Sequence, residues 1–321
     1  MMNWLVDQRL DTLAVMVWFR KTTSLVALVI LFTFCSLASP YFFALINFQN
    51  ILRQTAINGF LALGLTMVIL VGGIDLSLGG ILGLVAIVGA LLLKAGSELI
   101  SVVIIGVVIG MCVGALNGLL ITGFAIEPFV ITLGMQFVLR GLCFSLTKGK
   151  TVFVEMPFSF DFIANGDIGP IPFPTILLGT AYLLSYLMMR FTVFGRYLYA
   201  VGGNEEVVRL AGVNNKLVKV AVYTICGATA AMAGIINLSR INVGDPQAGQ
   251  GIILFIIGAV IIGGNKFVGG LGGVGYTIIG LLIIGLVSNI IILTGLGYYI
   301  QLIAEGSIII IAVLLQKERK S

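Results

Sequence analysis

The sequence predicts an all-α membrane protein, built as a polytopic helix bundle. Of its 321 residues, 59% are hydrophobic and only 10% are charged. Its mean hydropathy is +1.16, and apolar runs recur along the chain. A membrane-spanning helix needs about 20 mostly apolar residues, whereas a soluble domain carries about 25% charged residues. The composition therefore excludes a soluble globular fold.

The apolar runs predict about ten transmembrane helices. They cover residues 24–43, 55–71, 76–93, 99–121, 129–146, 171–189, 217–238, 252–262, 274–293 and 299–315. The eighth run is short, which favours a tilted, broken or partly re-entrant segment over a simple span. We expect one transmembrane domain over residues 24–316, preceded by a cytoplasmic segment at 1–23 and followed by a cytoplasmic tail at 317–321.

The distribution of basic residues predicts the orientation in the membrane. If the N-terminus is cytoplasmic, eleven basic residues fall on inside segments: Arg9, Arg20, Lys21, Arg190, Arg196, Arg209, Lys216, Lys266, Lys317, Arg319 and Lys320. Five fall on outside loops: Arg53, Lys94, Lys148, Lys150 and Arg240. Cytoplasmic loops carry the excess of Lys and Arg, so both termini are expected in the cytoplasm. We expect the first apolar run to remain as an anchor, because Phe32 and Phe34 spoil a small-residue signal cleavage site.

Residue types argue against a catalytic, metal or cofactor site. The chain has no histidine, the commonest metal ligand and the usual general base near neutral pH. Residues 270–275 fit G-x-G-x-x-G, but no βαβ unit surrounds them. Residues 144–151 end like a phosphate-binding loop, but Phe144 replaces its first glycine. We therefore expect no enzymatic activity, no metal and no cofactor. The scattered basic residues also argue against nucleic acid.

Glycines in the fourth run predict close helix packing. Gly106, Gly110, Gly114 and Gly118 recur every four residues, so they share one helix face. Small residues at this spacing allow two membrane helices to approach closely. A compact bundle is expected around this helix.

Two glycine-framed breaks interrupt the apolar pattern, VGGIDLSLGG at residues 71–80 and IGGNKFVGG at 262–270. Broken helices at membrane depth are tolerated only against protein or a water-filled path. The breaks therefore favour a transport protein. Asp75 either faces such a path or caps the N-terminus of the third helix.

The longest inside loop, residues 190–216, encodes a short helix within GGNEEVVRLAGV. Its signals are an N-cap, acidic residues in the first turn, a basic residue in the last turn and a glycine stop: Asn204, Glu205 and Glu206, Arg209, and Gly212. So short a helix is marginal alone in water. Its apolar residues need a surface, either the bundle or a cytoplasmic partner: Val207, Val208, Leu210 and Ala211.

Charged residues within spans are costly and point to function. Arg140 and Glu305 are the clearest examples. Arg140 either reaches the outer interface, faces a polar path or pairs with Glu305. Amides within spans either line a path or bond between helices: Asn117, Gln136, Asn237, Asn289 and Gln301. The residues we assign to a translocation path are Asp75, Asn117, Gln136, Arg140 and Asn289.

Four segments resemble the sugar-transporting permeases of bacterial ABC importers, most closely the ribose type. They are SPYFFALINFQNILRQTAINGFLALGLTMVILVGGIDLSLGG (39–80), NGLLITGFAIEPFVITLGMQFVLRGL (117–142), GRYLYAVGGNEEVVRLAGV (195–213) and GAVIIGG (258–264). The resemblance covers nearly the whole chain.

This resemblance implies a non-catalytic subunit of the bacterial inner membrane that moves a monosaccharide inward. The implied partners are two ATPase subunits, a second permease chain, an external sugar-binding protein and membrane lipid. The helix from Asn204 to Gly212 then resembles the element that couples ATP hydrolysis to alternating access. Two alternatives remain. One is an ion-coupled secondary transporter with a relay through Asp75, Arg140 and Glu305. The other is an ABC permease for branched-chain amino acids.

Overall fold

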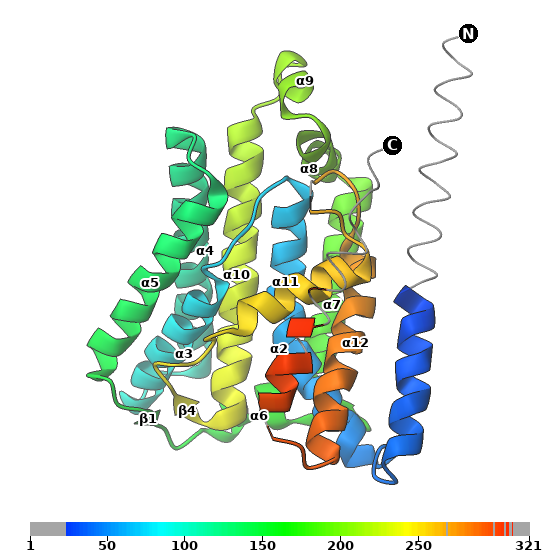
Figure 1. The fold of residues 1–321 in the computed structure, drawn as a ribbon. Helices are drawn as coiled ribbons and strands as arrows, with labels where there is room; N and C mark the ends of the chain where they lie inside the picture. The colour runs from blue at the N-terminus through cyan, green and yellow to red at the C-terminus, as the bar shows by residue number, and fades with distance from the viewer. Residues whose placement is uncertain (1–23, 268, 298, 305, 308–309, 311–321) are drawn as a thin grey trace.

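The protein is a helix bundle (Figure 1), described here by a computed structural model for residues 24–267, 269–297, 299–304, 306–307 and 310. The helices are α1 Ser24–Ala38, α2 Leu45–Leu70, α3 Leu78–Lys94, α4 Leu99–Phe124, α5 Pro128–Thr147, α6 Phe158–Asn165, α7 Phe173–Phe191, α8 Val193–Gly203, α9 Glu205–Leu210, α10 Asn215–Ile241, α11 Ile252–Gly263 and α12 Val274–Leu293. Two short antiparallel pairs join β1 Val152–Phe153 to β4 Val243–Gly244, and β2 Asp167–Ile168 to β3 Ile171–Pro172.

The first nine predicted runs each overlap a helix, which confirms the all-α membrane bundle. Within the described residues, five helices are long and apolar enough to cross a membrane. The pair α7 and α8, bent by 77°, makes a sixth if it counts as one span. The tenth run, residues 299–315, is described only in part, and residues 1–23 and 317–321 lie outside the described residues.

The eighth run forms α11, a helix too short to cross a bilayer alone. Its 12 residues extend about 18 Å at 1.5 Å per residue, whereas the hydrocarbon core is about 30 Å thick. In Figure 1, α11 lies obliquely across the bundle. The tilted or re-entrant interpretation therefore fits this run, and a full span does not.

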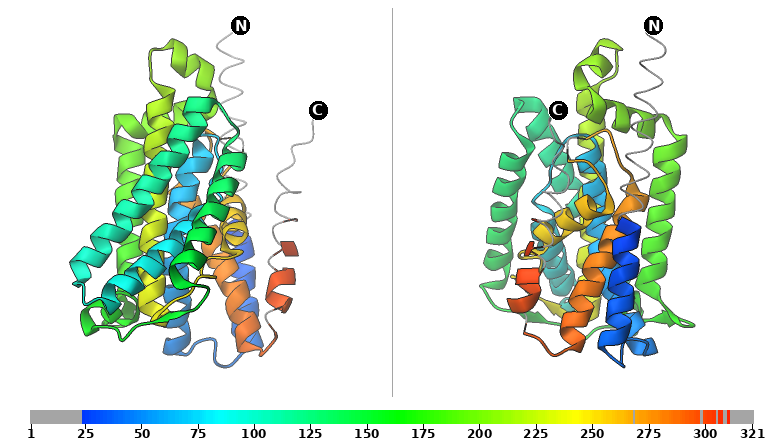
Figure 2. Two further views of the ribbon diagram at one scale, coloured as in Figure 1. Left: turned by 90° about the vertical axis from the view of Figure 1, so that its left-hand side faces the viewer. Right: turned by 45° about the vertical axis from the view of Figure 1, so that its right-hand side comes forward.

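The helices α2, α3, α4 and α10 form the centre of the bundle. The second half of α2 is buried, whereas α4 buries one stripe that contains the four predicted glycines. A Cβ atom at Gly110 would overlap the carbonyl oxygen of Gly227 in α10, and one at Gly114 would overlap that of Tyr223. The predicted close approach is confirmed, and α10 is the neighbour. Figure 2 shows α5 on one side of this centre and α1 on the other.

The two glycine-framed breaks meet in space. Residues 71–77 link α2 to α3, and residues 264–273 link α11 to α12. The amide of Gly270 donates to the carbonyl oxygen of Leu70 at 2.9 Å. Gly202 of α8 packs against the same two groups. We call this contact of three segments the backbone junction. The broken backbone therefore packs against protein.

The bundle has two distinct ends. One end carries α8 and α9 together with the loops that join α2 to α3 and α11 to α12 (Figure 1). The other carries α6 and the β1–β4 pair. We refer to them as the α9 end and the α6 end.

Candidate functional site

The predicted loop helix is α9. The Oδ1 atom of Asn204 accepts hydrogen bonds from the amides of Glu206 and Val207, both at 3.1 Å. The helix ends at Leu210, and Gly212 has a φ of +82°, a conformation that glycine adopts without strain. These contacts confirm the predicted cap and stop. Both features could be predicted from sequence because they depend only on neighbouring residues.

Contacts with α10 fix the position of α9. Lys219 pairs with the carboxylate of Glu205 at 2.6 Å, and Asn215 donates to the backbone carbonyl of Glu205 at 2.6 Å. The sequence did not predict either contact, because each joins residues of two different helices. Lys219 moreover lies inside a predicted span. Within α9, Arg209 donates to Glu206, and these hydrogen bonds and its charge hold the pKa of that carboxyl below its ordinary value. The two contacts of Glu205 therefore link the start of α9 to the start of α10.

One face of α9 has no partner in the described part of the chain. Val208 is buried, but Val207 is 60% exposed and Leu210 is 76% exposed. At the start of α10, Leu217 is 66% exposed. Apolar side chains on a protruding polar loop are typical of a surface that another protein covers.

A cavity of about 630 Å³ lies between α2, α12 and the segment before α11. Amide side chains dominate its polar lining: Asn47, Asn50, Gln54, Asn58, Gln250, Asn289 and Gln301. Among the described residues that line it, Arg240 alone is charged. We call it the amide cavity. Its lining comes from the first half of α2 and the second half of α12, so it lies in the half of the bundle nearer the α6 end (Figure 1).

Hydrogen bonds order the polar lining of the amide cavity. Asn289 donates to Asn47 at 2.7 Å, and Asn47 donates back at 3.3 Å. The guanidinium of Arg240 donates to Gln54. The Oδ1 atom of Asn58 is buried and accepts no hydrogen bond within the described structure. Apart from Arg240, the described polar side chains of the cavity are neutral donors and acceptors, which suits a ligand rich in hydroxyl groups.

A second cavity, of about 390 Å³, lies beside α5 and contains two predicted path residues, Gln136 and Arg140. Gln250 lines this side cavity and the amide cavity. Arg140 donates to the carbonyl oxygens of Pro246 at 2.5 Å and Ala248 at 3.0 Å. It therefore holds the segment between the two cavities instead of reaching the interface. Gln136 accepts from the Gly80 amide at 2.6 Å.

The remaining predicted path residues form a separate buried cluster. The Oδ1 atom of Asp75 accepts from the Ser77 amide at 2.8 Å and from the Ser77 hydroxyl at 2.6 Å. Asn117 donates to the same hydroxyl at 2.9 Å. Ser77, not Asp75, is the N-cap residue of α3, so Asp75 orders the turn before the helix and does not itself cap it. Neither Asp75 nor Asn117 lines the amide cavity or the side cavity.

The structure thus separates the five predicted path residues into three places, of which the amide cavity holds only Asn289. Sequence reasoning missed the amides of α2, although a signal was present. Asn47, Asn50, Gln54 and Asn58 recur at intervals of three and four residues, which places them on one helix face. Among the described residues, Asp75 and Arg140 share no ion pair. Glu305 lies outside the described residues.

Comparisons with known proteins place this geometry in a family. Residues 47–315 match the family described as "Branched-chain amino acid transport system / permease component". The ribose import permease protein RbsC of Escherichia coli (strain K12) is 37% identical over 306 residues, covering 94% of this chain and 95% of the relative. RbsC of Bacillus subtilis (strain 168) is 38% identical over 303 residues, covering 94% of each.

Another relative is named for a different sugar. The D-allose transport system permease protein AlsC of Escherichia coli (strain K12) is 36% identical over 305 residues, covering 94% of this chain and 92% of the relative. No solved structure matches the chain. With its apolar bundle and its match over most of its length, the chain is a multi-pass protein of the bacterial inner membrane and belongs to the family of ABC transport permeases that includes the ribose import permeases.

Proposed function

We propose that this chain is the membrane subunit of an ATP-driven importer that moves a neutral monosaccharide, similar to ribose, into the cell. Separate ATPase subunits supply the energy, an external binding protein delivers the sugar, and a second permease chain completes the pathway. In this proposal the chain itself performs no covalent chemistry. We also propose that residues 24–316 form one transmembrane domain, with its coupling loop at 190–216. Both ends of the chain then lie in the cytoplasm.

The observation that carries the proposal is the chemistry of the amide cavity. Sugars present hydroxyl groups that both donate and accept hydrogen bonds, and side-chain amides offer both partners. The described residues that line the cavity include no carboxylate. A zwitterionic amino acid would need charges or helix termini of both signs, whereas a sugar needs neither. The cavity therefore favours a sugar over a branched-chain amino acid, despite the wording of the family's description.

The α9 face supplies the second part of the proposal. ATPase subunits would cover Val207 and Leu210, which no described part of this chain covers. Movement of α9 would reach the bundle by two routes, the contacts of Glu205 with α10 and the backbone junction at Gly202. The first route reaches α10 at the centre of the bundle, and the second reaches the broken segments after α2 and α11. Such contacts between rigid elements suit alternating access.

Transport by the reconstituted complex tests this function. The chain should be purified with its ATPase subunits, placed in vesicles with its binding protein, and supplied with labelled ribose. We expect uptake that requires ATP and that unlabelled monosaccharides inhibit, whereas leucine does not. Uptake driven by an ion gradient without ATP would support a secondary transporter instead. Competition by leucine would support an amino-acid permease.

A further inference from the structure

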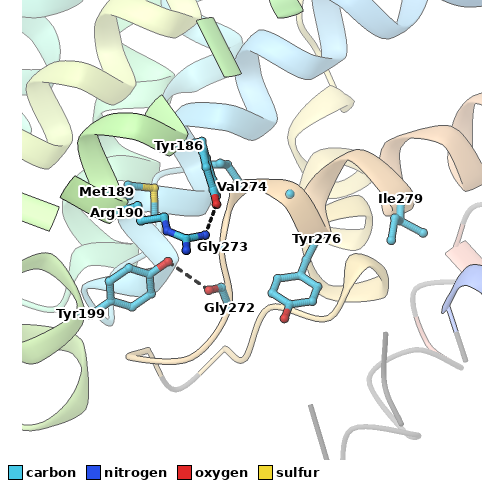
Figure 3. A pocket seen from close by; sticks show the side chains of 10 residues that line it. Tyr186, Met189, Arg190, Tyr199, Gly272, Gly273, Val274, Tyr276 and Ile279 are labelled. Atoms are coloured by element: carbon cyan, nitrogen blue, oxygen red, sulfur yellow. Dashed lines mark hydrogen bonds between the residues drawn. The ribbon is translucent and has the colours of Figure 1, made fainter. Parts of the chain in front are cut away.

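A third cavity, of about 400 Å³, lies at the α9 end between α7, α8 and the start of α12. Its lining includes Tyr186, Arg190, Tyr199 and Tyr276, together with the apolar side chains of Met189, Val274 and Ile279 (Figure 3). We call it the boundary cavity. None of these residues lines the amide cavity or the side cavity, so transport of the solute does not explain it.

Arg190 provides a positive charge in this cavity. Its guanidinium donates to the hydroxyl of Tyr186 and lies 5.7 Å from the centre of that ring. It lies 5.6 Å from the centre of the Phe191 ring. No carboxylate among the described residues forms an ion pair with it. The charge is thus held in place by aromatic contacts and is not neutralised, which leaves it available to an anion.

The opposite wall combines polar backbone with apolar side chains. The Tyr199 hydroxyl donates to the carbonyl oxygen of Gly272 at 3.1 Å and ties α8 to the segment before α12 (Figure 3). Val274 is buried, and Ile279 and Tyr276 are partly exposed on α12. A ligand of this cavity therefore meets a cation at one side and an apolar surface at the other, so it must be amphipathic.

The cavity lies where α7 passes from apolar to polar surroundings. Leu183, Leu184 and Leu187 are 57%, 61% and 41% exposed, as expected of a helix that faces lipid. Arg190 follows in the last turn of α7, after which the chain bends by 77° into α8. Tyrosine and arginine at the end of a membrane helix mark the level of the lipid headgroups.

We propose that the boundary cavity binds one anionic phospholipid. Its phosphate lies against the guanidinium of Arg190, because guanidinium matches the geometry of phosphate oxygens, and the hydroxyls of Tyr186 and Tyr276 donate further hydrogen bonds. An acyl chain lies along Met189, Ile279 and the exposed leucines of α7. The lipid thereby joins α7 and α8 to α12 beside the backbone junction. The proposal requires that the chain lies in a membrane, but it does not depend on which solute is carried.

Lipid retention by the intact chain tests this site. The full chain should be purified from nanodiscs that contain equal amounts of phosphatidylglycerol and phosphatidylcholine, and retained lipid should be counted by native mass spectrometry. We expect preferential retention of one phosphatidylglycerol. Arg190→Gln should weaken that retention about tenfold, because it removes the charge-assisted hydrogen bonds to the phosphate. An excess of inorganic phosphate should not displace the lipid.

Arg196→Gln is the matched control, because Arg196 is also an exposed arginine, in α8, and does not line the cavity. Its retention should equal that of the unaltered chain. The proposal would be overturned if both variants lost lipid equally or if Arg190→Gln lost none. It would also be overturned if phosphatidylcholine were retained equally well or if inorganic phosphate displaced the lipid. If Arg190→Gln does not fold, Tyr276→Phe decides: it removes one hydroxyl, and it should weaken retention about threefold. Unchanged retention in that variant would also overturn the proposal.

Discussion

Asn58 lines the amide cavity, but its side-chain carbonyl oxygen is buried, and no described residue donates a hydrogen bond to it. Leaving a buried acceptor unpaired costs about 1–3 kcal/mol. A turn of this amide toward the cavity on binding would let a solute hydroxyl donate to the oxygen and remove that cost, so this amide is the sharpest test of the cavity. Its neighbours Asn47 and Asn289 already bond to each other, and their loss would disturb α2 and α12 together.

We predict that Asn58→Leu raises the KM for sugar uptake about threefold to tenfold, since it removes one neutral hydrogen bond. Association with the ATPase subunits should not change. The measurement is initial uptake in the reconstituted complex at varied sugar concentration. Gln49→Leu is the control, because Gln49 lies on the same helix but does not line the cavity. The same KM in both variants would exclude Asn58 from the solute's path.

At the scale of single elements, α9 combines a rigid frame with an uncovered apolar face. Its cap at Asn204 and its ion pair with Lys219 lie within the chain. Reversing the charge of Glu205 or Arg209 would therefore break contacts inside the chain as well as any contact outside it. The exposed apolar side chains separate these two effects.

We predict that Leu210→Glu leaves the bundle folded and weakens association with the ATPase subunits at least about tenfold, as expected for an apolar residue at the centre of an interface. Co-purification and sugar-stimulated ATP hydrolysis measure the effect. The control is Phe153→Glu at the α6 end, where Phe153 is 72% exposed. Full co-purification of the Leu210→Glu chain would show that α9 is not the docking element.

The backbone junction is a second element whose role a matched pair of glycines can test. A Cβ atom at Gly202 would overlap the carbonyl oxygen of Leu70 and lie 2.6 Å from the Gly270 nitrogen, whereas one at Gly203 meets nothing within 4 Å. The two residues are adjacent in α8. Overpacking of this kind costs about 1–3 kcal/mol.

We predict that Gly202→Ala lowers the thermal unfolding temperature and reduces uptake per ATP hydrolysed, because α8 must move away from Leu70. Gly203→Ala should match the unaltered chain in both measurements. Thermal unfolding in detergent and the ratio of uptake to hydrolysis in vesicles provide the data. Equal behaviour of the two variants would argue against the junction as a route from α9 to the bundle.

For the whole molecule, the two ends of the bundle predict its orientation. The loop helix and the basic segments near it, including Arg190, Arg196 and Lys216, belong to the α9 end. The positive-inside rule then places the α9 end in the cytoplasm. The amide cavity, which lies in the half of the bundle nearer the α6 end, would then receive solute from the exterior.

We predict that an impermeant maleimide labels Phe153→Cys in intact cells and labels Val207→Cys only after the cells are opened. Both positions are well exposed, so access to the reagent depends on the side of the membrane. The four native cysteines should first be replaced by alanine or serine. Labelling of Val207→Cys in intact cells would contradict both the orientation and the proposed docking of ATPases.

The sequence by itself determined the features that depend on local order or on period. The apolar runs predicted the helices, Asn204 and Gly212 marked the limits of α9, and glycines every four residues predicted the close approach of α4. These signals are contained within a single segment, so no knowledge of neighbouring segments was needed. The four segments that resemble ribose permeases likewise indicated the family, because each of them is continuous in the chain.

Only the tertiary structure decided which distant residues share a site. It joined the amides of α2 to Asn289, gave Arg140 its carbonyl partners near residue 247, and brought Gly202 to Leu70 and Gly270. It also showed that α11 lies obliquely. Each of these depends on packing between segments far apart in the chain. An apolar run or an isolated amide has the same pattern whichever neighbour it meets, so the folded bundle selects the partner.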